Sequence, residues 1–143
     1  MSLFVDTSAF YALLDSTDAN HPEAAEVWRR VVEGAEPAVT TNYVVVESTA
    51  VLQRRLGLPA VRAFIEDAVP MVQVEWVTRE HHGAATSALL AAGRRGLSLV
   101  DCTSFEVMRR LGLRRAFAFD PDFEKQGFEL VTSSPSERGG GGD

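Results

Sequence analysis

This chain of 143 residues has few of the features that mark secreted or membrane proteins. Cys102 is its one cysteine, which excludes intrachain disulfides and cysteine-based zinc sites. No apolar run approaches the ~20 residues that a membrane-spanning helix needs. The N-terminus also lacks the basic and apolar regions of a signal peptide. We therefore expect a cytoplasmic protein with no membrane association.

Positive charge is also scarce, because the formal net charge is -6. This argues against indiscriminate nucleic-acid binding through a basic surface. The cations are almost all arginine and come as doublets, namely Arg29-Arg30, Arg54-Arg55, Arg94-Arg95, Arg109-Arg110 and Arg114-Arg115. Arginine binds phosphate through a planar fork, but cations near helix C-termini also suit the helix dipole. For any single doublet we favour a solvated helix face, and the sequence does not say which doublets meet a substrate.

Short apolar runs alternate with helical patterns along the chain. Strands are expected at 3–5, 38–39, 71–77 and 115–120, with a short fifth strand at 128–131. Helical patterns lie between them at 7–15, 21–37, 43–57, 59–69, 79–96 and 99–112. This alternation predicts an α/β fold, with a mostly parallel sheet of four to five strands covered on both faces. The domain spans residues 1–132, and the Ser/Gly-rich residues 133–143 form a tail that we expect to be disordered.

Four carboxylates stand in apolar surroundings, where an ionised group is costly to bury unless something compensates it. Asp6 follows Leu-Phe-Val, Glu47 follows three valines, Asp101 lies in LSLVDCTSF and Asp120 follows Phe-Ala-Phe. Taken singly, three of them have a favoured structural explanation. Asp6 and Asp120 suit helix N-caps, and Ser98 with Asp101 has the form of a capping box. Glu47 has no such explanation, because it lies inside a helix where no cap is needed.

The expected topology brings these four acids together. Ligands of parallel α/β sheets bind outside the carboxyl ends of the strands. Asp6 and Asp120 end two strands, whereas Glu47 and Asp101 lie in early turns of two helices. Crowded carboxylates raise one another's pKa and need neutralisation. Because oxygen ligands suit Mg²⁺ or Mn²⁺, the sequence predicts a site for one or two such ions.

The segments around these acids carry a resemblance to a known family. They are FVDTSAFYALLD, YVVVESTAVLQRRLG, LSLVDCTSFEVMRRLG and RAFAFDPDFEKQGFELV. In this order and spacing the chain resembles a PIN-domain ribonuclease, and among those a VapC-type toxin of a type II toxin–antitoxin system. The resemblance covers nearly the whole chain except the Gly-rich tail. It implies a three-layer α/β/α PIN-like fold and an endoribonuclease that hydrolyses RNA phosphodiester bonds with Mg²⁺ or Mn²⁺.

Carried over by position, the resemblance also implies the functional residues and partners. The catalytic, metal-binding acids would be Asp6, Glu47, Asp101 and Asp120. The polar neighbours that would assist them are Thr7, Ser8, Thr103, Ser104 and Asp122. The resemblance further implies a homodimer and a small cognate antitoxin. We expect the RNA to be single-stranded or looped, because a flexible strand bends into an acidic cleft whereas an A-form duplex is rigid.

Several alternatives were compared with this interpretation. A haloacid-dehalogenase-like phosphatase needs a second aspartate two residues after the first, where this chain has Ser8. A non-catalytic PIN-like binding scaffold is opposed by the presence of all four acids. A housekeeping RNA-processing nuclease with the same fold is compatible with the sequence. His21, His81, His82 and Cys102 are expected to have structural or surface roles, since none has a partner that indicates chemistry.

Overall fold

The computed structural model of the protein describes residues 2–131, so the expected tail at 133–143 lies outside the described residues. Five strands form one sheet in the order β3-β2-β1-β4-β5, and every neighbouring pair is parallel. The strands are β1 (Leu3–Val5), β2 (Ala38–Thr41), β3 (Gln73–Glu75), β4 (Arg115–Phe117) and β5 (Glu129–Leu130). The predicted α/β fold with its parallel sheet is confirmed.

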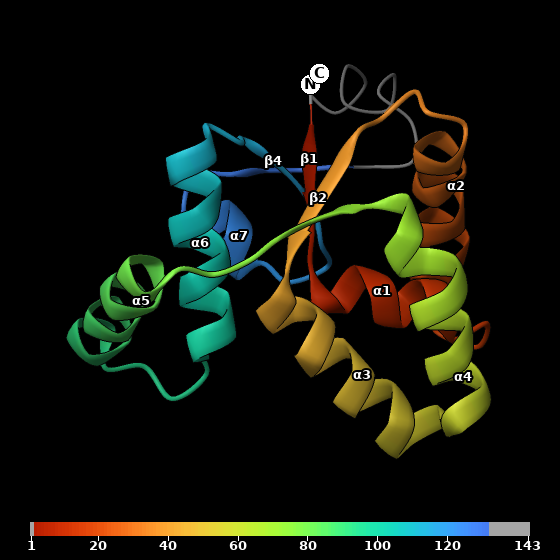
Figure 1. Ribbon diagram of the computed structural model, residues 1–143, viewed down its shortest axis with the longest axis horizontal. Helices are drawn as coiled ribbons and strands as arrows, with labels where there is room; N and C mark the ends of the chain where they lie inside the picture. The colour runs from red at the N-terminus through yellow and green to blue at the C-terminus, as the bar shows by residue number, and fades with distance from the viewer. Residues whose placement is uncertain (1, 132–143) are drawn as a thin grey trace, which may run out of the picture.

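Helices flank the sheet on both faces, which gives the predicted three-layer α/β/α arrangement. Figure 1 shows α1, α2 and α4 on one side of the central strands and α5 and α6 on the other, with α3 running below the carboxyl ends. The helices are α1 (Thr7–Leu14), α2 (His21–Val32), α3 (Asn42–Leu56), α4 (Leu58–Ala63), α5 (Arg79–Ala92), α6 (Leu99–Leu111) and α7 (Asp122–Lys125). Over residues 2–131, none of them is long and apolar enough to cross a membrane.

Local sequence signals explain where these helices begin. The side chains of Asp6, Thr41, Thr78 and Ser98 each accept a hydrogen bond from a backbone N–H in the first turn of their helix. Thr41, the last residue of β2, thus caps α3. Three of these caps come directly after or close to a strand end, so they fix how the chain leaves the sheet.

The segment after Ala63 differs from the single helix predicted for 59–69. The chain continues from α4 into a π-helical turn, η1 (Phe64–Ala68), and then a 3-10 turn, η2 (Val69–Met71). Pro70 lies in η2 and lacks the backbone N–H that a continuing α-helix would use. Hydrophobic spacing alone does not distinguish these tighter and wider turns from an α-helix.

The segment after β4 also corrects the predicted boundaries. The strand expected at 115–120 ends at Phe117, so Asp120 lies in the loop beyond it rather than at its last position. The short helix α7 follows at Asp122. The sequence offered Asp120 as a helix N-cap but gave no range for a helix after it, and Pro121 takes the N-cap position instead. A helix of four residues spans barely one turn, too little for a hydrophobic period to be visible in the sequence.

The core lies between the sheet and its helices. All three residues of the central strand β1 are fully buried, as expected for a parallel strand covered on both faces. Phe10 of α1 packs edge-on against Phe64, with ring centroids 4.9 Å apart. Phe105 of α6 packs in the same way against Phe123 of α7, also at 4.9 Å. These aromatic pairs fix the elements that carry the acidic residues.

Candidate active site

The four acids singled out in the sequence lie in one hollow at the carboxyl edge of the sheet. The hollow has a volume of about 340 Å³, and Asp6, Glu47, Asp101 and Asp120 all line it. They come from the end of β1, the second turn of α3, the first turn of α6 and the loop after β4. Their convergence follows from the parallel topology, which collects strand ends and helix starts at one edge.

Asp6 is the most buried of these acids, with 4% of its surface exposed. Ser8 donates its backbone N–H and its hydroxyl to Asp6 Oδ2, at 3.1 and 2.6 Å. Burial nevertheless raises the pKa of Asp6 from 3.8 to about 6, and the Asp101 carboxylate adds to that rise. Within the described part of the chain, Asp6 forms no ion pair. A buried carboxylate in this state attracts a cation from outside the chain.

Asp101 combines a structural role with a partly buried charge. Its Oδ2 accepts the backbone N–H of Ser98 at 3.1 Å and closes the predicted capping box of α6. Burial raises the pKa of Asp101, and the carboxylates of Asp120 and Glu47 raise it further. The cap therefore does not exclude a role as a ligand, because it occupies one of the two carboxylate oxygens.

Asp120 and Asp122 extend the cluster around Asp101. One carboxylate oxygen from each of these three residues lies within 4.8 Å of the others, a spacing that could hold a metal ion. Asp120 Oδ1 also accepts the backbone N–H of Asp122 at 2.9 Å. Asp122 differs from its neighbours because its Oδ1 already pairs with Arg94, at 3.1 Å. Its assisting role stays a prediction that follows from the resemblance.

Glu47 is more exposed than expected from the apolar residues around it in the sequence. It is half-buried, and Val46 beside it is 68% exposed. Its place in the hollow follows from helical spacing, because Glu47, Val51 and Arg55 lie four residues apart and line the same hollow. The hollow therefore takes one whole face of α3, and Glu47 reaches the other acids from that face.

The polar residues next to the acids divide into two groups. Thr7 and Ser8 line the hollow. The Ser8 hydroxyl accepts the backbone N–H of Phe119 at 2.9 Å, which ties the loop after β4 to Asp6. Thr103 and Ser104 do not line it. Thr103 donates to the carbonyl of Leu99 at 2.8 Å, an ordinary contact inside a helix.

The geometry can now be compared with known proteins. The PIN domain family matches residues 3–129, which is most of the chain. The chain belongs to the PIN-domain family. The resemblance that its sequence segments suggested is confirmed.

Two relatives and two solved structures place this PIN domain more closely. It is 40% identical over 132 residues to the 23S rRNA-specific endonuclease VapC20 of Mycobacterium tuberculosis, from strains CDC 1551 / Oshkosh and ATCC 25618 / H37Rv. The match covers 90% of this chain and 97% of each relative. The crystal structure of M. tuberculosis VapC20, described as a sarcin-ricin loop cleaving toxin, has a TM-score of 0.79 at 38% identity. That match covers 92% of this chain and 99% of the other.

The second structure is FitAcB from Neisseria gonorrhoeae, with a TM-score of 0.65. It covers 92% of this chain and 97% of the other chain at 10% identity, so it supports the fold alone. Neither comparison tests individual residues. The roles of Asp6, Glu47, Asp101 and Asp120 in this PIN domain therefore stay a prediction.

The sequence did not single out two residues of the hollow in this PIN domain. Tyr11 and Arg55 line it together with the acids. Arg55 was noted only as one half of a doublet. The signal that identifies it is its spacing of eight residues from Glu47, two turns along α3, which places both on one face.

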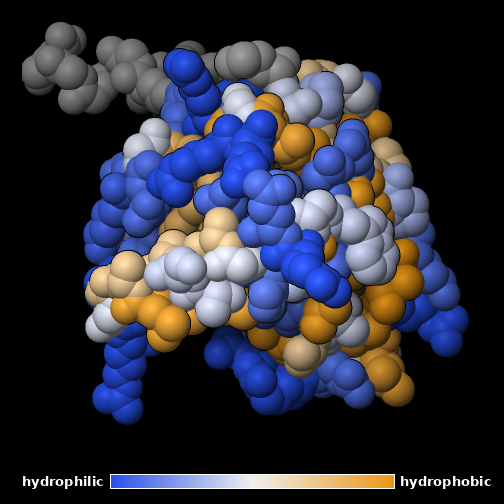
Figure 2. Space-filling view, turned by 60° about the vertical axis from the view of Figure 1, so that its left-hand side comes forward, coloured by the Kyte–Doolittle hydropathy of each residue, from blue (hydrophilic) through white to orange (hydrophobic). Residues whose placement is uncertain are grey.

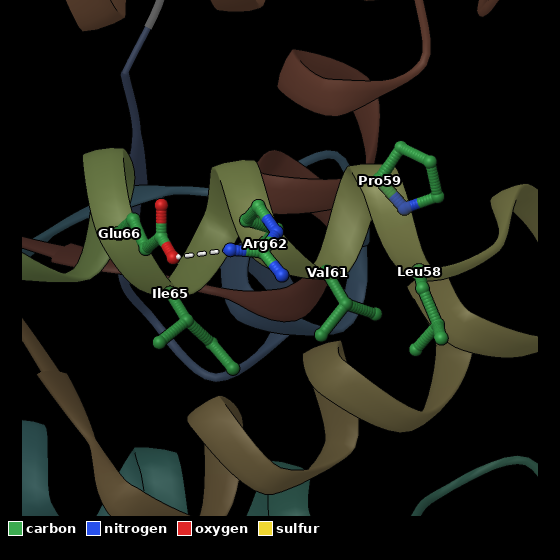
Figure 3. A pocket seen from close by; sticks show the side chains of 6 residues that line it. All are labelled: Leu58, Pro59, Val61, Arg62, Ile65 and Glu66. Atoms are coloured by element: carbon green, nitrogen blue, oxygen red, sulfur yellow. Dashed lines mark hydrogen bonds and ion pairs between the residues drawn. The ribbon is translucent and has the colours of Figure 1, made fainter.

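A larger hollow in this PIN domain lies on α4 and has different chemistry. Its volume is about 510 Å³, and Figure 3 shows the side chains of Leu58, Val61 and Ile65 pointing to the same side of the helix. Its two charged residues, Arg62 and Glu66, pair with each other at 3.1 Å. Size alone therefore does not mark the chemical site, because this hollow has no unpaired acid.

Two histidines and the cysteine of this PIN domain have contacts or burial that suit a structural role, whereas the buried Nδ1 of His81 has no hydrogen-bond partner in the described residues. His21 Nδ1 lies 2.9 Å from the carbonyl oxygen of Ala12, and His82 Nδ1 lies 2.7 Å from the Tyr43 hydroxyl. Cys102 is buried, and burial raises the pKa of its thiol. A protonated, buried thiol is a poor nucleophile.

Proposed function

We propose that this PIN domain is an endoribonuclease that hydrolyses RNA phosphodiester bonds with Mg²⁺ or Mn²⁺. The observation that carries the proposal is the hollow lined by Asp6, Glu47, Asp101 and Asp120. Burial raises the pKa of two of these acids, and over residues 2–131 none of the four forms an ion pair. Such a site is electrostatically incomplete, and a divalent cation completes it.

The donor set fits the hard cations Mg²⁺ and Mn²⁺, because it offers carboxylate oxygens without sulfur or imidazole. Asp101 and Asp120 would hold the ion, with Asp122 as a third ligand or beside it, and Asp6 and Glu47 line the same hollow. Thr7 lines the hollow, and its buried Oγ1 has no hydrogen-bond partner in the described residues.

The bound ion would supply positive charge that lowers the pKa of a water and stabilises the charge developing on the phosphate. The chain's own residues hold the geometry. Ser8 fixes Asp6 through two hydrogen bonds. Ser98 fixes Asp101 by the capping box. Oriented oxygens of this kind need little rearrangement when the reaction begins.

We propose looped or single-stranded RNA as the substrate, and a toxin role for the enzyme. The relatives are named 23S rRNA-specific endonucleases, and the structural neighbour is named a sarcin-ricin loop cleaving toxin. A loop of ribosomal RNA is therefore the substrate class we favour for this chain. The hollow supports this choice, because its acids reach the surface at one sheet edge, where a flexible strand can bend toward them.

The proposed partners are a small cognate antitoxin and a second copy of the chain. A toxin that cuts RNA in the cytoplasm needs an inhibitor in the same compartment. For the homodimer, support comes from large apolar side chains left at the surface: Val46 of α3 is 68% exposed and Leu90 of α5 is 77% exposed. Figure 2 shows the side that carries α5 and α6, where hydrophobic residues lie among hydrophilic ones.

Substitution of Asp6 tests the proposed chemistry. We expect Asp6→Asn to abolish divalent-metal-dependent RNA cleavage, because the amide removes a negative charge from the proposed metal site. The fold should persist, since asparagine also caps helices well. The measurement is single-turnover cleavage of an RNA stem–loop across a Mg²⁺ and Mn²⁺ titration, with circular dichroism as the check of folding.

Asp67→Asn is the matched control, because Asp67 is exposed and does not line the hollow. We expect this control to cleave like the wild type. If Asp6→Asn also cleaves like the wild type in the same titration, the site is assigned wrongly. If the wild type cleaves no RNA with either metal, the chain is a PIN-like binding scaffold.

A further inference from the structure

We propose that Arg55 binds a phosphate of the RNA beside the bond that is cut, and that Tyr11 positions its guanidinium. This inference rests on the proposed function, since it concerns the RNA of that same site. It identifies which of the arginines in this acidic protein meets the substrate.

Most arginines with defined contacts are neutralised by the chain itself. Side-chain ion pairs link Arg29 to Glu26 and Glu33, Arg62 to Glu66, Arg94 to Asp122, Arg110 to Glu80 and Glu106, and Arg115 to Glu36. Arg55 has no carboxylate partner among residues 2–131, although it lines the hollow that holds four acids. Its charge is therefore available at the place where a polyanion would have to enter.

The position of Arg55 on α3 separates it from the proposed metal ligands. Glu47 and Arg55 share one face of the helix and lie eight residues apart, roughly 12 Å along its axis. Arg55 therefore stands at one end of the hollow rather than among the carboxylates. This suits a group that contacts the backbone of the strand next to the reacting phosphate.

Tyr11 provides the support for the guanidinium. The Cζ atom of Arg55 lies 5.4 Å from the centroid of the Tyr11 ring. The Tyr11 hydroxyl donates to Asp15 Oδ2 at 2.8 Å, and Asp15 Oδ1 accepts the hydroxyl of Thr17 at 2.6 Å. These hydrogen bonds hold the ring from its far end and leave its face to the arginine. A guanidinium held near a ring by a cation–π contact still offers N–H groups to a phosphate.

Charge explains why such a contact is needed. The hollow concentrates carboxylates in a protein of net charge -6, so it repels RNA except where a cation compensates. The proposed metal ion compensates at the acids, and Arg55 compensates at the end of the hollow. The competing explanation is that Arg55 acts only as a counter-ion for the acids. That explanation predicts a change in metal affinity instead of RNA affinity.

The experiment compares the two halves of one doublet, Arg55→Gln and Arg54→Gln, in the full chain. Arg54 is exposed and does not line the hollow, so it matches Arg55 in charge and helix position but not in site. Cleavage of a fluorescein-labelled RNA stem–loop in Mg²⁺ gives kcat and KM. Anisotropy with the same RNA, in the Asp6→Asn background that does not cleave, gives affinity as a function of salt. Mn²⁺ affinity is measured by titration calorimetry.

We expect Arg55→Gln to raise KM about tenfold and leave kcat within about twofold, because a lost hydrogen-bonded charge contact weakens binding by roughly that factor. The slope of log affinity against log salt should fall by about one. Arg54→Gln should change neither quantity, and Mn²⁺ affinity should be equal in all variants. Arg55→Lys should recover the salt slope but only part of KM, since it keeps the charge and loses the fork.

Three results would overturn the inference. One is an unchanged KM and salt slope in Arg55→Gln. Another is equal damage from Arg54→Gln, which would indicate net charge alone. The third is a loss of Mn²⁺ affinity or of kcat without a change in KM, which would make Arg55 a counter-ion. A wild-type chain that cleaves no RNA is a separate result, which contradicts the proposed function and leaves the binding comparison to decide the role of Arg55.

Discussion

Carboxylates at the two edges of the sheet differ in their electrostatic surroundings: one is paired with an arginine, and the four that line the hollow have no ion pair with a described residue. At the amino edge, Glu36 precedes β2 and forms a bidentate pair with Arg115, the first residue of β4, at 2.9 and 3.2 Å. That guanidinium lowers the pKa of Glu36. At the carboxyl edge, burial raises the pKa of Asp6 and Asp101, and the described residues place no ion pair on either. The chain neutralises a carboxylate that stabilises the fold and leaves the clustered ones to an outside cation.

This difference is informative because the same strands make both edges. Strands β2 and β4 flank β1 in the sheet, so Glu36 and Arg115 approach each other across the amino end of β1. Asp6 follows the carboxyl end of β1 directly. Both edges are therefore made by the same strands, with the same direction and burial. The electrostatic difference between the edges comes from the residues at the strand ends. Unneutralised carboxylates of this kind concentrate at functional sites.

The largest predicted effect is on the RNA cleavage rate. It appears when a carboxylate is replaced by its amide at one edge in one variant and at the other edge in a second variant. We expect Asp101→Asn to lower the RNA cleavage rate at least about a hundredfold, because a metal site contributes several kcal/mol of transition-state stabilisation. Glu36→Gln should cleave within about twofold of the wild type. Single-turnover cleavage with saturating Mg²⁺ measures both. Equal losses in the two variants would mean that the edges do not differ in function.

The second effect concerns stability and pH in the metal-free protein. The pKa of Asp6 is about 6 in the folded chain and 3.8 without burial, so the folded state binds the proton more tightly. Its contribution to stability is complete below pH 4 and is lost as the pH rises through 6. Asp6→Asn lacks this loss, so we expect it to be roughly 1–3 kcal/mol more stable than the wild type at pH 7.5. The two should converge near pH 4.

Urea unfolding in EDTA at several pH values measures this difference. Mg²⁺ supplies the complementary control, because a ligand of the folded state raises the free energy of unfolding. It should stabilise the wild type and not Asp6→Asn. A variant that is less stable than the wild type at pH 7.5 would contradict the conclusion that the ionised Asp6 is left uncompensated.

The sequence predicted much of the carboxyl edge because its signals are local. The run before Asp6, the cap at Ser98 and the alternation of strands and helices each depend on neighbouring residues. Parallel topology then brings the acids together without any knowledge of distances. Glu47 was selected for apolar surroundings, although it is only half-buried, and its position in the hollow follows from the helix face instead.

The amino edge and the arginines were harder to predict for a physical reason. The pair of Glu36 and Arg115 joins residues 79 positions apart, and a long-range pair of side chains leaves no periodic signal. The doublets looked alike in the sequence, yet Arg29 faces two glutamates of its own helix while Arg55 faces the hollow. The sequence indicated a helix start near Asp120 but gave no range for α7, because a single turn shows no hydrophobic period.

The third effect tests the neutralised pair itself. Glu36→Gln removes the negative charge and one of the two acceptor oxygens of a pair whose side chains are only 15% and 19% exposed, so it leaves a partly buried guanidinium without its counter-charge. We expect the free energy of unfolding to fall by about 1–2 kcal/mol at pH 7. Because the pKa of Glu36 is lowered by folding, this stabilisation exists above its usual value of 4.5 and is lost as the pH falls below it.

Urea unfolding between pH 3 and pH 8 measures this effect and its sign. The destabilisation should shrink on acidification. Asp6→Asn should also converge with the wild type on acidification, but from the more stable side, so the two variants differ from the wild type with opposite sign. The two variants thus test the comparison of the edges with one method. A destabilisation that stays constant down to pH 3 would indicate lost packing rather than a lost ion pair.

The smallest effect on stability concerns an exposed ion pair. It distinguishes the contribution of ion pairing itself from the contribution of burying the pair. Arg29 pairs with Glu33 at 2.8 Å and also with Glu26, but all three side chains are about half exposed. Water screens the attraction between such exposed charges, and the remaining side chains stay hydrated when one of them is replaced. The pairing therefore contributes little to the free energy of unfolding. We expect Arg29→Gln to unfold in urea at the wild-type midpoint at every pH, in contrast to Glu36→Gln. A midpoint lowered as far as that of Glu36→Gln would show that ion pairing stabilises this fold wherever it occurs, and the amino edge would lose its distinction.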